Sequence, residues 1–364
     1  MTTLDRYILR GLVANYLIAI TVMISLYVVL DLFFNMDEFT ETEGEVLRNM
    51  ASFYGTRIYL YFAQLSGVIT LFACLITLAR MRRQNELTAV LASGVSLYRL
   101  AAPVVAFALL TSILWYVDSE VIIPRIAHKL ARRHDDAQGE RTFRVRFLRA
   151  ANDDLLSADQ YRPKDQLLRR MPVLRRGPDG ELLSILEAEQ ASWEPDPRKP
   201  GRGRWRLERG VERRRGTIGG ELAAGDADRV LVDYYETDLD PQAIEMRQAS
   251  GWMRYLSTRR LSEVAATLTG EARQRADQQR YARFTTPLIS ILMLFLGLPF
   301  ILDRMPGSLL VAGSRALLVC GACFLLTFIV QNFTVQGSFS TLPAWAPIIV
   351  FTPVAVVLLD RLRT

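Results

Sequence analysis

The segment Leu78–Leu100, LARMRRQNELTAVLASGVSLYRL, separates two long apolar runs. It begins with a basic cluster and continues with the carboxylate of Glu86. A helix over Asn85–Val95 would carry four apolar residues on one stripe, Leu87, Val90, Leu91 and Val95. Such a helix is too short to cross a bilayer, which takes about 20 residues, and Gly94 is expected to end or bend it. The pattern predicts a short helix on a membrane surface, held at each end by a membrane span.

Hydrophobic residues make up 50% of the 364-residue chain, and they concentrate near its two ends. Four uncharged runs have the length of a membrane span: Gly11–Leu30, Ile58–Ala79, Leu100–Val117 and Phe284–Leu302. A last uncharged stretch, 316–359, is too long for one crossing and contains the loop-like sequence QNFTVQGSFSTLP. It divides into Ala316–Val330, with a start nearer Leu309, and Leu342–Leu359. The sequence therefore predicts six membrane helices.

Basic residues gather in the connections on one side of these spans. They are Arg6, Arg10, Arg80, Arg82, Arg83, Arg99, Arg304, Arg315, Arg361 and Arg363. The opposite side has an uncharged last loop and an acidic first loop with Asp37, Glu38, Glu41, Glu43 and Glu45. Because basic short loops stay in the cytoplasm, the chain is predicted to be a multi-pass protein of the inner membrane with both termini cytoplasmic.

The region between the third and fourth spans has a different pattern and is predicted to lie outside. Apolar and polar residues alternate in RTFRVRFL, ELLSILEAEQASW, GRWRLERGVE and DRVLVDYYETDL, with Pro, Gly and Asp between them. This alternation is typical of a small antiparallel sandwich or open barrel. Helical spacing returns at Leu261, Val264, Ala265 and Leu268, with Ser257 or Thr258 as a possible N-cap.

These patterns predict three regions. Residues 1–123 hold spans one to three and a short helix near 82–98, residues 124–282 hold the outer β domain and its return helix, and residues 283–364 hold spans four to six. The β domain is either a soluble cap or a module whose open sheet edge pairs with a strand of another protein.

The short helix near Glu86 has two interpretations. It can lie on the headgroups, with its arginines near anionic lipid. Alternatively, it is a coupling helix that binds a cytoplasmic partner and transmits motion to spans two and three. A carboxylate is of little use to anionic lipid, which favours a partner, but Glu86 can also cap its own helix or pair with Arg82 or Arg83.

Several segments together resemble the LptF/LptG (YjgP/YjgQ) permease family. They are LDRYILR before span one, ARMRRQNELTAVLASGVSLYRL, and RYARFTTPLISILMLFLGLPF at span four, with the soluble domain placed after span three. The resemblance covers the whole chain in architecture and is specific in the 86–99 segment and at span four. It leaves open whether the chain is LptF-like or LptG-like.

The resemblance implies a half-transporter with six membrane helices and a periplasmic jellyroll-like β domain. Two such subunits, identical or homologous, would bind an LptB-like cytoplasmic ATPase dimer that uses ATP and Mg. They would extract lipopolysaccharide or a related lipid and pass it to LptC/LptA-like periplasmic jellyroll bridge proteins. The chain itself is expected to bind no cofactor.

The resemblance also implies two groups of site residues. The ATPase-coupling group is Arg82, Arg83, Glu86, Leu87, Val90 and Leu91, with Glu86 matching the family's coupling-helix glutamate. Spans one and five would form a lateral gate, for which the candidates are Val22, Leu26, Tyr27, Leu30, Ala312, Ala316 and Cys320. The last three also form a row of small residues at four-residue spacing, which predicts close helix packing.

The outer end of span one departs from the family. Members often carry bases there that suit lipid phosphates, whereas VVLDLFFNMDEFTE has Asp31, Asp37 and Glu38 and no base. A carboxylate beside a phosphate is unfavourable. Cations from the partner subunit or the outer domain, or a different cargo, would resolve this conflict.

The sequence offers little for other functions. It lacks a P-loop motif, His128 and His134 lack metal-ligand spacing, and the Cys320–Cys323 pair lies inside a span. Asp31, Asp118 and Glu120 are expected to be solvated residues at the ends of spans. The net charge of +6 is spread among mixed charges, so no nucleic-acid partner is predicted. A membrane scaffold that recruits β-rich partners is the alternative function, and an enzyme is disfavoured.

Overall fold

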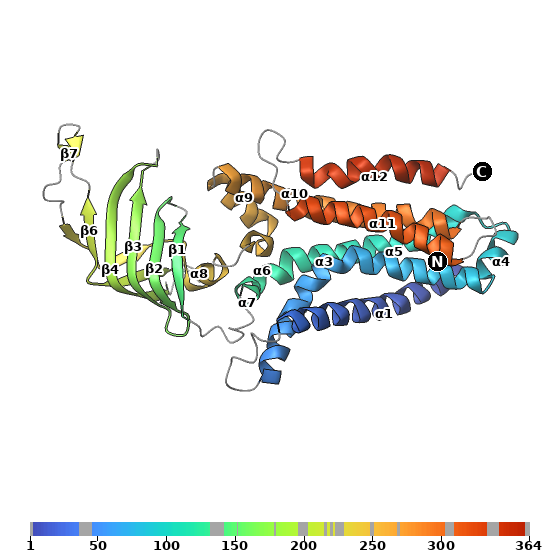
Figure 1. Cartoon of the computed structure of the whole chain (residues 1–364), viewed down its shortest axis with the longest axis horizontal. Helices are drawn as coiled ribbons and strands as arrows, with labels where there is room; N and C mark the ends of the chain where they lie inside the picture. The colour runs from blue at the N-terminus through green and yellow to red at the C-terminus, as the bar shows by residue number, and fades with distance from the viewer. Residues whose placement is uncertain are drawn as a thin grey trace. The chain divides into compact units, whose positions relative to one another are not determined.

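The structure is a computed structural model of the chain (Figure 1). It describes residues 3–35, 46–131, 142–150, 152–177, 180–195, 203–214, 217–218, 221–222, 229–247, 251–267, 270–302, 309–332 and 342–360. The chain forms two compact units: a helical unit of Met1–Phe34, Arg57–Pro124 and Leu256–Thr364, and an inserted unit of Asn35–Thr56 and Arg125–Tyr255.

Six helices in the described ranges are long and apolar enough to cross a membrane, which confirms the predicted number. They are α1 (Thr3–Phe34), α3 (Val46–Arg83), α5 (Leu97–Val117), α10 (Gly270–Leu302), α11 (Leu309–Asn332) and α12 (Leu342–Asp360) (Figure 1). Several are longer than the apolar runs because the helix continues into flanking polar residues. The acidic loop 37–45, the polar loop 333–341, and Arg304, Arg361 and Arg363 lie outside the described residues.

The helical unit is built around α10, which packs against α5, α11 and α12. Its close approach to α3 is favoured by Gly297, where an added Cβ would lie only 3.1 Å from Leu71 Cδ1 and 3.3 Å from Leu75 Cδ2. Small residues permit such approaches between membrane helices. The core of this unit is a single apolar cluster that includes Ile8, Leu12, Leu78, Leu100 and Leu296.

Helix α1 joins this core along only part of its length. Its buried residues are Asp5, Ile8, Leu12, Tyr16 and Ala19, spaced three or four apart on one face. From Thr21 to Phe34 no described side chain of α1 is buried, although several are half-buried. Helix α1 is therefore anchored at its N-terminal half and presents an apolar surface along its C-terminal half.

The inserted unit contains an eight-stranded antiparallel sheet. Its strands are β1 (Phe143–Arg149), β2 (Leu155–Arg162), β3 (Leu167–Arg176), β4 (Leu182–Pro195), β5 (Gly203–Glu208), β6 (Val211–Arg214), β9 (Arg229–Leu231) and β10 (Tyr234–Glu236). Two short strands, β7 (Thr217–Ile218) and β8 (Glu221–Leu222), pair separately. This sheet confirms the predicted β domain between the third and fourth spans.

Strand β4 organises the sheet. It pairs with β3 on one side, while on the other side its first half pairs with β6 and its second half with β5. Strands β9 and β10 pair in turn with β6 and β5. The break between β5 and β6 falls at Arg209, with φ 54°, and Gly210, where a Cβ would lie only 2.1 Å from the Val232 carbonyl oxygen. Only glycine fits this approach of two backbones.

One face of the sheet covers an apolar core in which Tyr161, Trp205 and Tyr235 are fully buried. The polar atom of a buried Trp or Tyr side chain usually finds a hydrogen-bond partner, as it does for two of these three residues. The Trp205 indole donates to the Leu239 carbonyl at 2.9 Å, and the Tyr235 hydroxyl donates to Asp154 at 3.0 Å. Burial, and then the neighbouring Asp154 carboxylate, raise the pKa of Tyr235, so its phenol keeps the proton that it donates.

Short helices connect the two units. The outgoing chain passes through η1 (Asp118–Ile122), α6 (Ile123–Arg125) and α7 (Ala127–Leu130). The returning chain passes through α8 (Pro241–Arg247), η3 (Trp252–Tyr255) and α9 (Thr258–Thr267). Leu261 and Ala265 are buried residues of α9, and Leu268 lies outside the described residues.

Candidate functional site

The segment between α3 and α5 folds into one short helix, α4 (Glu86–Ala92). Asn85 breaks the chain from α3 with a left-handed φ of 58°, a conformation that asparagine tolerates. Gly94, with φ 84°, follows the end of α4. The helix is therefore shorter than the expected Asn85–Val95 stretch, and the expected helix near 82–98 is in fact three elements. Arg82 and Arg83 belong to the last turn of α3.

The apolar stripe of α4 packs against its own chain. Leu87 is 4% exposed within the apolar cluster of the helical unit, and Val90 and Leu91 pack against that cluster. A helix of this length has no stability of its own in water. These contacts therefore hold α4 on the end of the helical bundle and leave Thr88, Ala89, Ala92 and Ser93 exposed.

The two arginines of the predicted coupling group lie in different surroundings. Arg82 donates from Nη1 to the carbonyl oxygens of Phe300 and Ile301, at 3.5 and 3.1 Å, near the C-terminal end of α10. A cation is favourable at this end of a helix, where carbonyl groups lack partners. Arg83 is exposed beside α4. Arg82 therefore joins α3 to α10, whereas Arg83 lies on the open surface.

Two polar contacts join this segment to the beginning of α1. The Tyr7 hydroxyl lies 2.8 and 2.9 Å from the two carboxylate oxygens of Glu86 and donates its proton to that group. Arg99, in the first turn of α5, forms an ion pair with Asp5 at 3.0 Å. The contact of Glu86 with α1 had no signal in local sequence spacing, because its partner lies 79 positions away.

The gate candidates of α1 lie on its exposed half. Val22, Leu26, Tyr27 and Leu30 are all exposed apolar side chains. The α11 candidates lie differently, since Ala316 and Cys320 are buried and Ala312 is half-buried. The Cys320 thiol lies 3.3 Å from the Met293 carbonyl of α10. Cys320 of the small-residue row therefore packs against α10. The exposed face of α11 carries larger residues that the sequence pattern did not single out, namely Val311, Leu317, Leu318, Leu325 and Phe328.

Asp31, at the outer end of α1, does not lie in solvent as expected. It is half-buried and accepts a hydrogen bond from the Tyr61 hydroxyl of α3 at 3.3 Å. The Tyr61 and Tyr27 rings lie 4.4 Å apart. The Asp31 carboxylate therefore faces α3 of the same chain. Asp37 and Glu38 lie outside the described residues.

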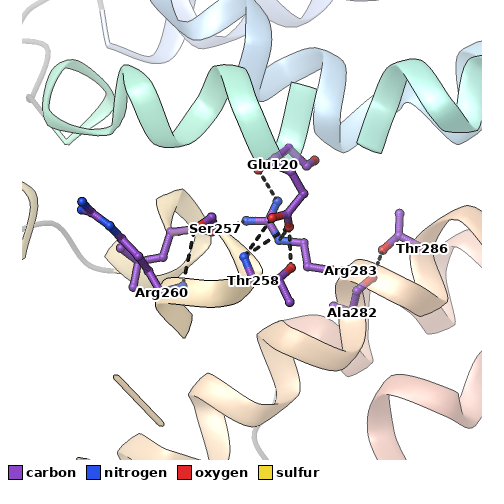
Figure 2. Close-up of polar contacts among 9 residues, drawn as sticks. Glu120, Ser257, Thr258, Arg260, Ala282, Arg283 and Thr286 are labelled. Carbon is purple, nitrogen blue, oxygen red and sulfur yellow. Dashed lines mark hydrogen bonds and ion pairs between the residues drawn. The ribbon is translucent and has the colours of Figure 1, made fainter. Parts of the chain in front are cut away.

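A second polar cluster lies at the other end of α5 (Figure 2). Arg283 of α10 donates to the carbonyl oxygens of Ser119 at 2.7 Å and Leu256 at 2.9 Å. Glu120 accepts from the backbone N–H of Thr258 at 3.0 Å and from its hydroxyl, and it lies 4.0 Å from the Arg283 guanidinium. A carboxylate is favourable at the N-terminus of α9. These contacts hold together the segments that lead to and from the inserted unit.

The expectation of solvated end residues is wrong for Asp118 and Glu120. The Asp118 residue is 3% exposed and the Glu120 side chain 13% exposed. Both lie in the π-helix η1, in which the Ile123 N–H donates to the Asp118 carbonyl five residues back. Alternation and hydropathy could not reveal this burial, because it depends on Arg283, 164 positions beyond Ser119. In the same cluster, Ser257 is the α9 N-cap, accepting from the Arg260 N–H at 3.4 Å (Figure 2).

The described residues do not form a cluster of three or more His, Cys, Asp or Glu side chains that could hold a metal ion. Cys74, Cys320 and Cys323 are buried free thiols. His134 lies outside the described residues.

Comparison with known families gives an independent result. The family model described as lipopolysaccharide export system permease LptF/LptG matches residues 6–361, nearly the whole chain. No curated protein matches the chain. Six membrane helices with an antiparallel β domain between the third and fourth fit that match. The chain therefore belongs to the LptF/LptG family of lipopolysaccharide export permeases and is a multi-pass protein of the inner membrane.

Proposed function

We propose that the chain is a permease subunit of an ABC transporter. It extracts lipopolysaccharide or a related lipid from the inner membrane and passes it to periplasmic jellyroll bridge proteins of the LptC/LptA type. An LptB-like ATPase dimer, with ATP and Mg, supplies the energy through α4. A second six-span subunit, identical or homologous, completes the membrane unit. Both termini and α4 are cytoplasmic, and the β domain is periplasmic.

The observation that carries this proposal is the position of α4. It precedes α5, whereas the segment leading to the β domain follows α5. A 21-residue helix rises about 1.5 Å per residue, so the two lie about 30 Å apart. That is the thickness of a bilayer core. An engine acting on α4 and a β domain receiving lipid would therefore lie on opposite sides of the membrane.

The exposed C-terminal half of α1 also supports the proposed lipid extraction. Although Ile20 and Met23 still pack against the core, most of its apolar side chains after Ala19, including Val22, Leu26 and Leu30, are exposed. They are suited to line a lateral opening shared with a second subunit. The sheet edges support transfer: β1 pairs only with β2, and β10 only with β5, among the described strands. Open edges can add strands from another β protein.

A photocrosslinking experiment tests lipid extraction. A photoreactive residue replaces Val22 of α1, which is 58% exposed, or Val356 of α12, which is 60% exposed and serves as the control. In membranes that contain the partner ATPase, we expect lipopolysaccharide adducts at Val22 that change with ATP, whereas Val356 captures mainly phospholipid. A scaffold that moves no lipid would give the same lipid adducts at both positions, with or without ATP.

A further inference from the structure

The beginning of α1 makes two polar contacts with the α4 region, as described above. Tyr7 donates to Glu86 of α4, and Asp5 pairs with Arg99 of α5. We propose that Asp5 and Tyr7 are positioning residues that transmit movement of the α4 region to α1. This inference rests on the proposed function, because it assumes that a partner acts on α4.

The two contacts hold α1 from different sides. Asp5 and Tyr7 are two positions apart, which places their side chains about 200° apart around the helix axis. The Asp5 side chain points into the protein and is 13% exposed, whereas Tyr7 is 50% exposed. One contact leads to Glu86 at the start of α4 and the other to Arg99 at the start of α5. Movement of α4 relative to α5 would therefore turn or tilt α1.

The contacts are suited to transmission more than to folding. The apolar residues Ile8 and Leu12 already fix the N-terminal half of α1 in the core. The Asp5–Arg99 pair includes an Arg99 side chain that is 50% exposed, and ion pairs with an exposed partner contribute little to stability. Neither contact is needed to bury apolar surface. Their effect is to fix the direction of α1 relative to α4.

Because of the way α1 packs, its C-terminal half can move when its N-terminal end is rotated. The last buried residue of α1 is Ala19, and beyond it Val22, Leu26 and Leu30 are exposed, while Met23 and the Asp31–Tyr61 hydrogen bond keep a lighter contact with the rest of the unit. A small rotation imposed at Asp5 and Tyr7 would therefore displace the exposed half, including Val22, Leu26 and Leu30. Those side chains are the ones that we propose to line the opening for lipid. A Glu86 carboxylate has up to four acceptor positions, so its bond to Tyr7 leaves room for a donor of the partner.

The test distinguishes a loss of transmitted movement from a loss of ATPase binding. Tyr7→Phe removes only the hydroxyl, and Asp5→Asn removes only the charge, so the packing of α1 is kept. In proteoliposomes with the partner ATPase, we expect each variant to bind the ATPase normally but to release several-fold less lipid per ATP hydrolysed. Tyr59→Phe is the matched control, because Tyr59 is also exposed but lies in the far half of α3, and it should leave that ratio unchanged.

A charge exchange tests the ion pair directly. Arg99→Asp alone should uncouple lipid release, and Asp5→Arg combined with Arg99→Asp should restore much of it. An unchanged lipid-to-ATP ratio in both Tyr7→Phe and Asp5→Asn would overturn the inference, as would loss of ATPase binding in these variants. Failure of the unmodified protein to bind any ATPase would instead overturn the proposed function.

Discussion

Replacing Arg283 by methionine is expected to destabilise the helical unit severely. Arg283 is 7% exposed, and its guanidinium lies beside Glu120 and bonds to the Ser119 and Leu256 carbonyls. The Arg283→Met variant would leave the buried Glu120 carboxylate without its cation and the Ser119 and Leu256 carbonyls without their donor. Removing one partner of a buried ion pair typically costs about 3–5 kcal/mol. The protein should therefore accumulate poorly, and its apparent melting temperature in detergent should fall by on the order of 5–10 °C.

A matched variant on the same helix controls for the loss of a positive charge. Arg273 also lies on α10, but its side chain is 61% exposed. Its guanidinium lies 4.0 Å from the Asp277 carboxylate, so the two groups form a loose, exposed ion pair. Exposed pairs of this kind contribute about 0–1 kcal/mol, so Arg273→Met should melt almost like the unmodified protein. Equal melting temperatures for the two variants would show that the Arg283 cluster does not hold the two connecting segments together.

Leu87→Asp is expected to abolish coupling to the ATPase. Leu87 is the buried residue of α4, and a helix of seven residues is held in place by its packing. An aspartate there would have to bury an unpaired charge or pull α4 away from the bundle, at a cost of several kcal/mol. Undocked, α4 would no longer present a defined surface. We expect loss of ATPase co-purification and at least a tenfold fall in lipid-dependent ATP turnover.

The control for this prediction keeps the volume and the apolar character of the side chain. Leu87→Met should retain most of the coupling, because volume-conserving exchanges in a core usually cost less than about 1.5 kcal/mol. The melting temperature of the rest of the bundle should change little in either variant, since α4 lies at its end. Normal ATPase binding by Leu87→Asp would contradict our assignment of α4 as the coupling helix.

Hydropathy was sufficient for the membrane helices because each span must be continuously apolar over a bilayer thickness. It was less informative for the sheet, where β2 and β3 were missed. Strand β3, LLRRMPVLRR, contains Pro172, and Arg170 has a φ of 46°. Its buried residues Leu168 and Met171 are therefore three positions apart, which interrupts the alternation that reveals a strand.

Only the part of the candidate site that depends on local spacing was predicted from the sequence. The stripe of Leu87, Val90 and Leu91 follows from local spacing, and the structure places these side chains on one packed face. The Tyr7–Glu86, Arg82–Ile301 and Glu120–Arg283 contacts join residues far apart in sequence. Such contacts depend on how whole helices pack, which charge spacing along one chain does not reveal.

The proposed function requires α4 and the β domain to lie on opposite sides of the membrane. Labelling a single thiol in each of them tests this most directly. The test uses a variant whose three buried cysteines are replaced. Ala92→Cys then places one thiol on the exposed face of α4, and Leu231→Cys places one on β9, where the side chain is 80% exposed. We expect a membrane-impermeant maleimide, added to intact spheroplasts, to label Leu231→Cys at once. It should label Ala92→Cys only after the inner membrane is opened. Labelling of both thiols from the same side would show that α4 and the β domain face the same compartment, and would contradict the proposed function.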